Sequence, residues 1–395
     1  MTVFPSDFIY FYGIGTIAKG YPLTRLYDYA LQMRTFSEIY PFPYHVGVYG
    51  PCPYPPFVAL FFSLFARVPA VQAFFLWAFV SLVLYVSGIA AALKASFPAD
   101  RLHVSLIFSL ALIFWPFLHN TFGNGQISTI AVFSIGLAFM HERRSRQFTS
   151  GLALSILVYK PTLLLLLFPM LIVTRRFRTI GGFMSGATFL VFTATAFGGV
   201  EIWPAYMRFL RFFGRYVGFK EQSLHDLSLY VDFKSFIQAV CGGWSRAELV
   251  FFVLTIITMA ILLTTTIWKS AKSEAEVQCL VWATMLTWTL LLNVYVPIYD
   301  SILFPVAAVM TVGALRSLEW KEAAGWMTFL TVLIVLASWE LEKLSQVKGI
   351  QFLPILLAIY GSGQLYLLRR AVRQRLPREA HELPRAGGLS TVSSQ

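Results

Sequence analysis

One acidic residue near the start of the chain, Asp7, stands in an aromatic segment that includes Tyr10 and Tyr12. A carboxylate in partly apolar surroundings binds a proton more readily, because burial disfavours its charged form. Such a group is suited to remove the proton from an attacking hydroxyl. The alternative is that Asp7 caps a helix or pairs with Arg25. We predict Asp7 as a general base, with Tyr12 as a binding residue beside it.

A basic residue, Lys160, lies in the middle of the apolar stretch 151–173 and is followed by Pro161. Ionisable residues are rare inside apolar membrane segments and mark functional sites there. A cation at such a point can stabilise the negative charge of a phosphate. The alternative is a lysine that extends its ammonium group to the nearest interface. We predict that Lys160 contacts a phosphate.

A glycine-rich turn carries four polar candidates, and these are His119, Asn120, Asn124 and Gln126. Their side chains could bind hydroxyl groups or a phosphate, but a tight connection between two helices needs the same kind of turn. Both interpretations stay open for His119 and Asn124. Gln126 is the strongest candidate for the phosphate, because it stands at the start of a predicted span that faces the site.

A second acidic candidate, Asp300, follows Tyr299 and Pro297 at the start of a late apolar segment. An aspartate at this position can cap the helix and bind its free amide groups. Alternatively, Tyr299 and Asp300 bind a substrate or orient the site. The sequence leaves both roles open.

The composition identifies the class of protein that positions these residues. Of 395 residues, 57% are hydrophobic and 13% are charged, whereas soluble domains carry about 25% charged residues. Stretches such as 71–92 and 249–267 are nearly free of charge and long enough to cross a bilayer. The net charge of +12 comes from short basic clusters at the ends of apolar stretches, which is typical of membrane orientation and not of nucleic-acid binding.

We therefore predict an all-α polytopic membrane protein with about nine to eleven transmembrane helices, a broken helical hairpin and interfacial helices. The expected spans are residues 70–93, 102–118, 125–140, 180–199, 249–268, 277–292, 301–315, 323–338 and 352–368. The expected domains are a first outer loop with an interfacial helix (1–69), a first membrane module (70–200), an outer loop with an amphipathic helix (201–248), a second membrane module (249–368) and a basic, disordered cytoplasmic tail (369–395).

The stretch 151–173 is expected to form the hairpin. Arginines flank it on both sides, at 143–146 and 175–178, so both flanks should lie in the cytoplasm. Pro161 breaks a helix, and we predict two half-helices that turn at Lys160. A single crossing helix is the alternative.

This topology brings the candidate residues to one outer face. The face also receives the segment 201–248, where Arg208, Arg211 and Arg215 recur at helical spacing. This row of arginines favours anchoring to lipid headgroups over recognition of a specific donor. The topology also places Met1 outside with no preceding span and no signal peptide. We expect a first helix upstream of this sequence; translocation of a bare N-terminus is the alternative. The three cysteines cannot form a metal site, and we predict no metal.

The order of these motifs resembles a known family. The motifs follow one another as in glycosyltransferase family 87, within the GT-C superfamily. They are Asp7-Phe8, the stretch from Gly20-Tyr21-Pro22-Leu23 to Tyr27-Asp28, Tyr54-Pro55-Pro56-Phe57, Gly123-Asn124-Gly125-Gln126, Lys160-Pro161 and Tyr299-Asp300. Members of this family are mannosyltransferases that use polyprenyl-phosphate mannose. The resemblance covers about residues 7–315. The chain departs from the family pattern in lacking the first span.

The resemblance implies transfer of a sugar from a lipid phosphate to an acceptor hydroxyl on the outer side of the membrane, with inversion at the anomeric carbon. It implies a catalytic acid that matches Asp7, a glycan or glycolipid acceptor, and no cofactor, because the lipid-phosphate sugar is a substrate. The basic clusters predict a cytoplasmic C-terminus, and we expect a bacterial cytoplasmic membrane with the site facing the periplasm or exterior. A polysaccharide polymerase or ligase and a lipid-linked sugar transporter remain alternatives; a transporter would show internal repeats.

Overall fold

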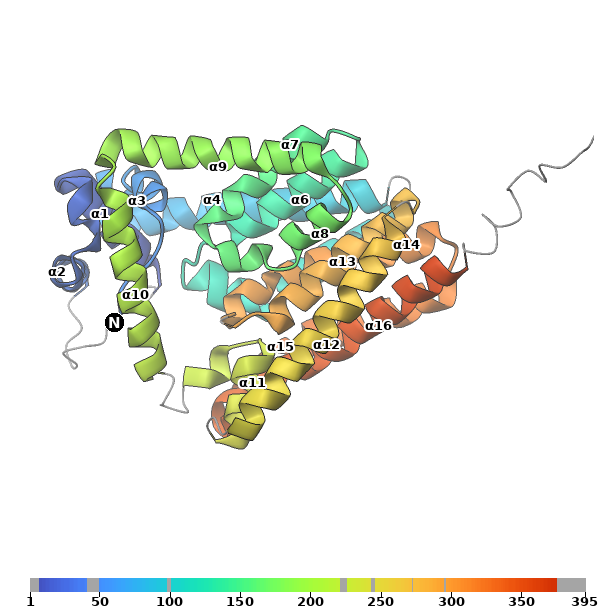
Figure 1. The fold of residues 1–395 in the computed structure, drawn as a ribbon. Helices are drawn as coiled ribbons and strands as arrows, with labels where there is room; N and C mark the ends of the chain where they lie inside the picture. Colours follow the sequence, from blue (N-terminus) through green and yellow to red (C-terminus); the bar gives the residue numbers. More distant parts are fainter. Residues whose placement is uncertain are drawn as a thin grey trace, which may run out of the picture.

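The computed structural model describes residues 7–40, 50–97, 101–220, 226–242, 246–271, 273–294 and 296–374. Within these ranges the regular structure is helical, and an isolated β-bridge joins Tyr230 to Pro297. Figure 1 shows two parts: a cap of mostly short helices at one end, and a bundle of longer helices that extends away from it.

The cap combines the first outer segment with one helix from the middle of the chain. It consists of α1 (Phe8–Gly20), η1 (Leu23–Tyr27), α2 (Tyr29–Ile39), α3 (Pro56–Phe62), η2 (Phe65–Arg67) and α10 (Ile202–Lys220). Asp28 caps α2, because its Oδ1 accepts a hydrogen bond of 3.2 Å from the backbone N–H of Leu31. The Phe11 and Phe62 rings stack 5.3 Å apart and join α1 to α3. The predicted outer loop is therefore largely helical where it is described.

The first half of the bundle follows the cap in sequence. Its elements are α4 (Ala70–Ser96), α5 (Arg101–Ile113), η3 (Pro116–Gly123), α6 (Thr129–Arg143), α7 (Gln147–Ser155), η4 (Ile156–Tyr159), η5 (Pro161–Leu164), α8 (Leu167–Val173) and α9 (Phe177–Gly198). Helices α4 and α6 touch through Gly88 and Gly136, where an added Cβ on Gly136 would overlap the Gly88 carbonyl. Small residues allow such close backbone approach between membrane helices.

The second half of the bundle completes the fold. Its elements are η6 (Asp226–Leu229), α11 (Phe233–Cys241), α12 (Arg246–Ser270), α13 (Ala275–Leu292), η7 (Ile298–Leu303), α14 (Phe304–Ser317), α15 (Lys321–Lys348) and α16 (Leu353–Arg373). Helices α13 and α14 are almost wholly buried and form the core, whereas α9 and α12 expose most of their apolar surface. Such surface is expected to face lipid.

Among the described residues, six helical segments are long and apolar enough to cross a membrane, and these are α4, α9, α12, α13, η7 with α14, and α15. A seventh results if α5 and η3, which meet at a bend of 55°, form one span. The segments predicted at 125–140 and 352–368 are helices, α6 and α16, but they do not reach this length and apolarity. The integral membrane class is therefore supported, while the predicted count of nine to eleven spans is not confirmed.

The chain breaks at Lys160, as predicted. Lys160 has φ −141° and ψ 77° and separates η4 from η5. Arg143, which precedes this segment, donates a hydrogen bond of 3.4 Å to Glu276, and Arg176, which follows it, donates one of 2.9 Å to Gln278. Both acceptors lie on the first turn of α13, so the segment between α6 and α9 begins and ends at the same end of the bundle. This arrangement is a hairpin and not a single crossing.

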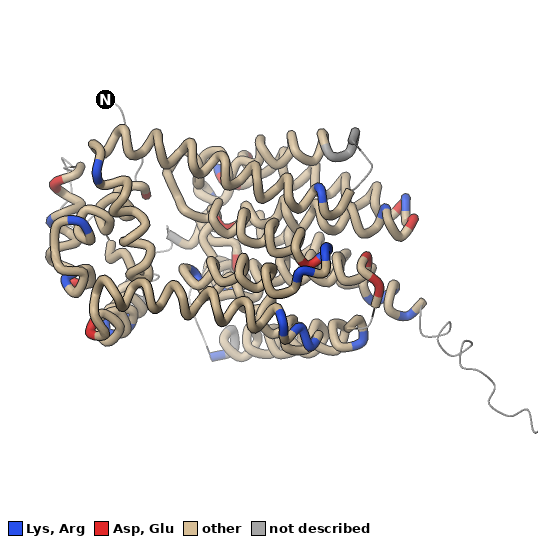
Figure 2. The backbone as a smooth tube through the Cα atoms, turned by 90° about the horizontal axis from the view of Figure 1, so that it is seen from above, with Lys and Arg blue, Asp and Glu red and all other residues tan. Residues whose placement is uncertain are grey.

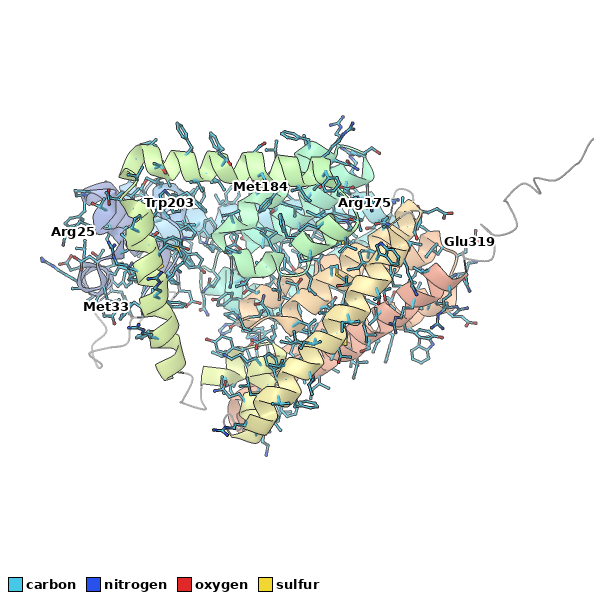
Figure 3. The ribbon with its side chains drawn as sticks, in the orientation of Figure 1. Arg25, Met33, Arg175, Met184, Trp203 and Glu319 are labelled. Carbon is cyan, nitrogen blue, oxygen red and sulfur yellow. The ribbon has the colours of Figure 1, made fainter. Side chains whose placement is uncertain are left out.

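Charged residues gather at the two ends of the molecule, and few lie between them (Figure 2). Figure 3 places Arg25 and Trp203 in the cap, and Arg175 and Glu319 at the far end of the bundle. Lys160 and Asp300 form an ion pair that is almost wholly buried. Because few charged residues lie within the bundle, this pair is a candidate for the functional centre.

Candidate functional site

The centre of the candidate site is an ion pair between Lys160 and Asp300. The Asp300 side chain is fully buried and that of Lys160 is 14% exposed. Ser128 donates a second hydrogen bond, of 2.7 Å, to the other carboxylate oxygen of Asp300. The Lys160 ammonium also lies 4.8 Å from the centre of the Tyr299 ring, within the range of a cation–π interaction. Each partner of the buried pair thus has the additional polar or aromatic contacts that a buried charge requires.

Two further hydrogen bonds hold this centre in place. The Asn293 side chain, at the end of α13, donates to the Thr162 carbonyl at 2.8 Å, just past the helix break. The Thr121 hydroxyl, on η3, donates to the Tyr299 carbonyl at 3.3 Å. The tip of the hairpin is therefore fixed to the segment that carries Asp300, and that segment is fixed to the polar turn.

Asp232, between η6 and α11, anchors the same segment. Its fully buried carboxylate accepts a hydrogen bond of 3.0 Å from the Val296 backbone N–H and one of 2.9 Å from the Ser235 N–H, at the N-terminus of α11. The Val231 N–H donates to the Val296 carbonyl at 2.8 Å. Burial raises the pKa of Asp232, although these hydrogen bonds act in the opposite direction. The sequence analysis missed Asp232; its signal is an acid directly before a short amphipathic helix.

Asp7 lies at the start of α1, beside the polar turn. The N–H of the next residue, Phe8, donates to the Asn124 carbonyl at 2.9 Å, and the Trp77 indole donates to the Gly125 carbonyl at 3.0 Å. Gly125 has a positive φ of 74°, and an added Cβ would overlap the Phe8 side chain. The turn is therefore held between α1 and α4, and Asp7 lies next to it.

The two alternatives for Asp7 differ from what the structure shows. The Asp7 side chain makes no capping hydrogen bond at the N-terminus of α1. Arg25 instead pairs with Asp28, at 2.8 Å. Asp7 is partly exposed, so solvent and substrate can reach its surroundings.

Tyr54 connects the region of Asp7 with the buried ion pair. Its ring lies 5.1 Å from the Phe11 ring on α1 and 6.4 Å from the Tyr159 ring, next to Lys160. The pKa of Tyr54 is raised well above its usual value, chiefly by burial, and charges on Cys52, Asp300, Tyr159 and Asp7 raise it further. The Tyr54 ring therefore links α1, which Asp7 precedes, to the residue next to Lys160. We did not select Tyr54 from the sequence, although its Tyr-Pro-Pro context was part of the resemblance.

Two side chains near this centre carry buried polar atoms. Gln126 is 6% exposed, and its side-chain oxygen has no hydrogen-bond partner among the described residues. The Tyr159 hydroxyl is also buried, and the Ala131 backbone lies beside it. Buried polar atoms in proteins are nearly always hydrogen-bonded, so the Gln126 oxygen is available for a bound molecule.

Other predicted residues make contacts within the protein. His119 stacks on Trp115, with ring centres 4.8 Å apart, and its neighbour Asn120 donates a hydrogen bond of 2.8 Å to Glu342 on α15. The Tyr12 hydroxyl donates to the Val68 carbonyl at 2.8 Å and joins α1 to the start of α4. The structure therefore brings Lys160, Asp300 and Tyr299 into contact, with Asn124 next to Asp7, but it does not bring His119 or the Tyr12 hydroxyl to this centre.

The comparison with known families assigns the chain. The model of glycosyltransferase family 87 matches residues 53–293, which is more than half of the 395 residues. The matched range contains Tyr54, Gln126 and Lys160, while Asp7 and Asp300 lie outside it. No curated protein and no solved structure matches the chain. The chain belongs to glycosyltransferase family 87 and is a membrane glycosyltransferase.

Proposed function

We propose that this glycosyltransferase moves mannose from a polyprenyl-phosphate carrier to a hydroxyl of a glycan or glycolipid acceptor, with inversion at the anomeric carbon. The observation that carries the proposal is the buried pair of Lys160 and Asp300 at the tip of the hairpin, with Tyr54 near both Asp300 and Asp7. A cation in an apolar setting fits a lipid phosphate, whose sugar must be transferred at the membrane surface.

The proposed architecture is of the GT-C type, in which α6 and α16 cross the membrane together with the six or seven apolar spans and give eight or nine spans. The cap of α1, α2, α3 and α10 then lies on the outer side of a bacterial cytoplasmic membrane. The end that carries Arg143 and Arg176 lies in the cytoplasm together with the C-terminus. Basic residues at this end support the orientation.

Lys160 is the proposed phosphate contact. A lysine ammonium has three donors, and the pair with Asp300 uses only part of them. Asp300 and Tyr299 hold the ammonium at the tip of the hairpin, where it meets the phosphate of the donor. The side-chain oxygen of Gln126 can accept a hydrogen bond from a hydroxyl of the same donor, and Asn124 and Tyr299 border the space for the sugar.

Asp7 is the proposed base. Asp300 is fully buried, and both of its carboxylate oxygens are occupied by contacts with Lys160 and Ser128. Asp7 lies partly exposed in the cap, where an acceptor can approach. Asp300 is therefore assigned to positioning Lys160.

The proposed reaction is one displacement. The acceptor oxygen attacks the anomeric carbon as Asp7 takes its proton, a new carbon–oxygen bond forms, and the bond from the anomeric carbon to the phosphate oxygen breaks. The bonding electrons leave with the polyprenyl phosphate, whose charge Lys160 stabilises. Asp7 later releases the proton to water. The proposal assigns no metal and no cofactor, because the lipid phosphate is a good leaving group.

A donor comparison tests this function. Membranes that contain the full chain are supplied with polyprenyl-phosphate mannose, glucose or arabinose, each radiolabelled, together with an endogenous acceptor fraction. We expect label transfer from the mannose donor alone and, by NMR of the product, an anomeric configuration opposite to that of the donor. Transfer only from the glucose or arabinose donor, or retention of configuration, would contradict the proposal.

A further inference from the structure

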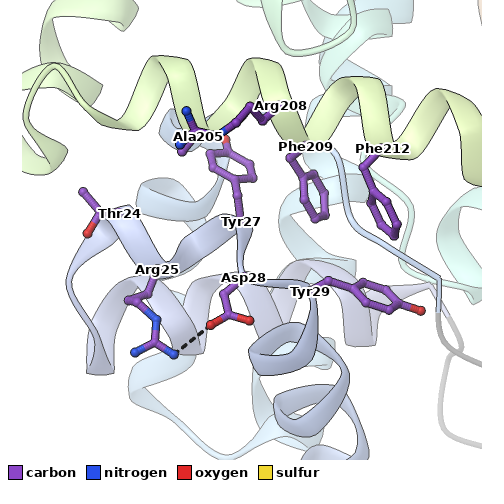
Figure 4. A pocket seen from close by; sticks show the side chains of 9 residues that line it. All are labelled: Thr24, Arg25, Tyr27, Asp28, Tyr29, Ala205, Arg208, Phe209 and Phe212. Carbon is purple, nitrogen blue, oxygen red and sulfur yellow. Dashed lines mark hydrogen bonds and ion pairs between the residues drawn. The ribbon is translucent and has the colours of Figure 1, made fainter.

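A separate cleft lies in the cap, between the segment 24–29 and α10. Its volume is about 430 Å³, and its lining includes Arg25, Tyr27, Arg208, Phe209 and Phe212. Figure 4 shows these side chains from the two segments facing one another. None of Asp7, Tyr54, Lys160 and Asp300 lines it, so the cleft is distinct from the candidate active site.

Aromatic side chains join the two walls of the cleft. The Tyr27 ring lies 5.4 Å from the Phe209 ring, and the Tyr29 ring lies 5.2 Å from the Phe212 ring. Phe209 and Phe212 themselves are 5.9 Å apart. Rings packed at these distances fix the spacing of the walls. The cleft is therefore a preformed feature of the cap.

The polar residues of the cleft leave one positive charge without compensation. Arg25 and Asp28 neutralise each other at 2.8 Å, and both remain accessible, with side chains 54% and 34% exposed. Arg208 is exposed, and no ion pair or hydrogen bond links it to the rest of the described chain. Arg208 therefore presents a guanidinium group to whatever enters the cleft, with Arg25 on the opposite wall (Figure 4).

We propose that this cleft binds a phosphate ester of a small polyol, with Arg208 on the phosphate and the aromatic rings against the apolar face of the polyol. A guanidinium group matches the oxygens of a phosphate with two parallel hydrogen bonds. A cationic headgroup does not fit, because Asp28, the only carboxylate in the lining, is already paired with Arg25. The phosphate ester belongs either to a membrane glycerophospholipid or to a soluble polyol phosphate. This inference goes beyond the proposed sugar transfer and does not depend on it.

Binding measurements on the purified full chain in an uncharged detergent test the cleft. The probes are short-chain dihexanoyl phosphatidylglycerol and glycerol 3-phosphate, titrated by isothermal calorimetry. We expect Arg208→Gln to weaken binding on the order of ten- to a hundredfold, the range for loss of a hydrogen bond to a charged group. Arg211→Gln, on the same helix but outside the lining, is the matched control and should bind as the parent does. Ala205→Phe should also weaken binding, because it fills the cleft without changing the charge.

The outcomes separate the two sources of the ligand. Binding of phosphatidylglycerol alone identifies the ligand as a membrane lipid, and equal binding of glycerol 3-phosphate identifies it as a soluble phosphate. In either case the binding should weaken in Arg208→Gln, and this result would support the proposed site. Equal losses in Arg208→Gln and Arg211→Gln would show general surface charge and overturn the proposal. Unchanged binding in Arg208→Gln, with thermal unfolding like that of the parent, would overturn it as well.

Discussion

The ammonium group of Lys160 pairs with the carboxylate of Asp300 across 140 residues of sequence, at the point where the hairpin turns inside the bundle. The pair has two consequences that can be separated. It neutralises two charges that would otherwise be buried alone, and it holds one cation where the proposed donor phosphate binds.

Breaking this pair should destabilise the fold. Asp300→Asn leaves the Lys160 charge buried without a partner, and loss of one member of a buried ion pair typically costs about 3–5 kcal/mol. The double variant Lys160→Met with Asp300→Leu removes both charges and should regain most of the lost stability, because apolar residues can replace a buried pair.

Thermal unfolding in detergent measures these stabilities, and membrane transfer assays measure activity. The double variant should be folded and inactive, since it lacks the phosphate contact. An active double variant would remove Lys160 from the proposed mechanism. Equal stability of the parent and Asp300→Asn would show that the pair is not buried as described.

The Tyr54 hydroxyl should contribute to transfer without contributing to packing. Tyr54→Phe keeps the ring against Phe11 and Tyr159 and removes the hydroxyl near Asp7 and Asp300. We expect thermal unfolding like that of the parent and a kcat/KM about tenfold lower, equivalent to one hydrogen bond. Steady-state assays with a fixed acceptor concentration give this ratio. Parental activity in Tyr54→Phe would make Tyr54 a packing residue only.

The buried carboxylate of Asp232 should give the fold a pH dependence. Burial raises its folded-state pKa above the unfolded value, so the folded state favours the protonated form. The stabilisation from this group is full below the unfolded pKa, about 3.9, and is lost as the pH rises through the folded pKa. In Asp232→Asn this titration is absent.

The difference in melting temperature between the parent and Asp232→Asn, measured from pH 4 to pH 8, should therefore change in favour of the variant as the pH rises. A difference that is constant over this range would show that the hydrogen bonds from Val296 and Ser235 fully offset the effect of burial. A change in favour of the parent would show that they exceed it.

The contact between α4 and α6 should not tolerate a methyl group. Gly136→Ala places a Cβ against the Gly88 carbonyl, and overpacking of this kind costs about 1–3 kcal/mol. Gly181→Ala on α9 is the matched control, because a Cβ there meets no atom within 4 Å. It should be neutral or slightly stabilising. Thermal unfolding of both variants checks this, and similar losses in the two would contradict the described packing.

The sequence predicted the broad architecture well, for a physical reason. Hydropathy and the positions of basic residues depend on the bilayer, so the helices α4, α9, α12 and α13 follow from the sequence alone. The break at Lys160 follows from Pro161, which cannot continue a helix. The number of spans could not be predicted in the same way. Helix α6 has only 15 residues, and α16 contains polar residues and ends in arginines, so neither is counted as a candidate span.

The contacts within the candidate site could be predicted from the sequence only in part. The topology placed Lys160 and Asp300 in the same region, but their pairing depends on how the hairpin packs against α13. His119 and Tyr12 were plausible site residues by type, yet His119 stacks on Trp115 and the Tyr12 hydroxyl binds the Val68 carbonyl. Whether such a residue reaches the site depends on the direction of its side chain. In an irregular segment the sequence has no periodicity from which that direction can be inferred.

The most direct test of the account is sugar transfer by Asp7→Asn. Membranes with equal amounts of the parent, Asp7→Asn and Glu38→Gln receive radiolabelled polyprenyl-phosphate mannose, and Glu38, an exposed acid on α2 paired with Arg34, provides the matched control. We expect a loss of transfer on the order of a hundredfold or more in Asp7→Asn, retained donor binding, and parental transfer in Glu38→Gln. Parental transfer by Asp7→Asn would contradict the account and would point to Asp300 as the base.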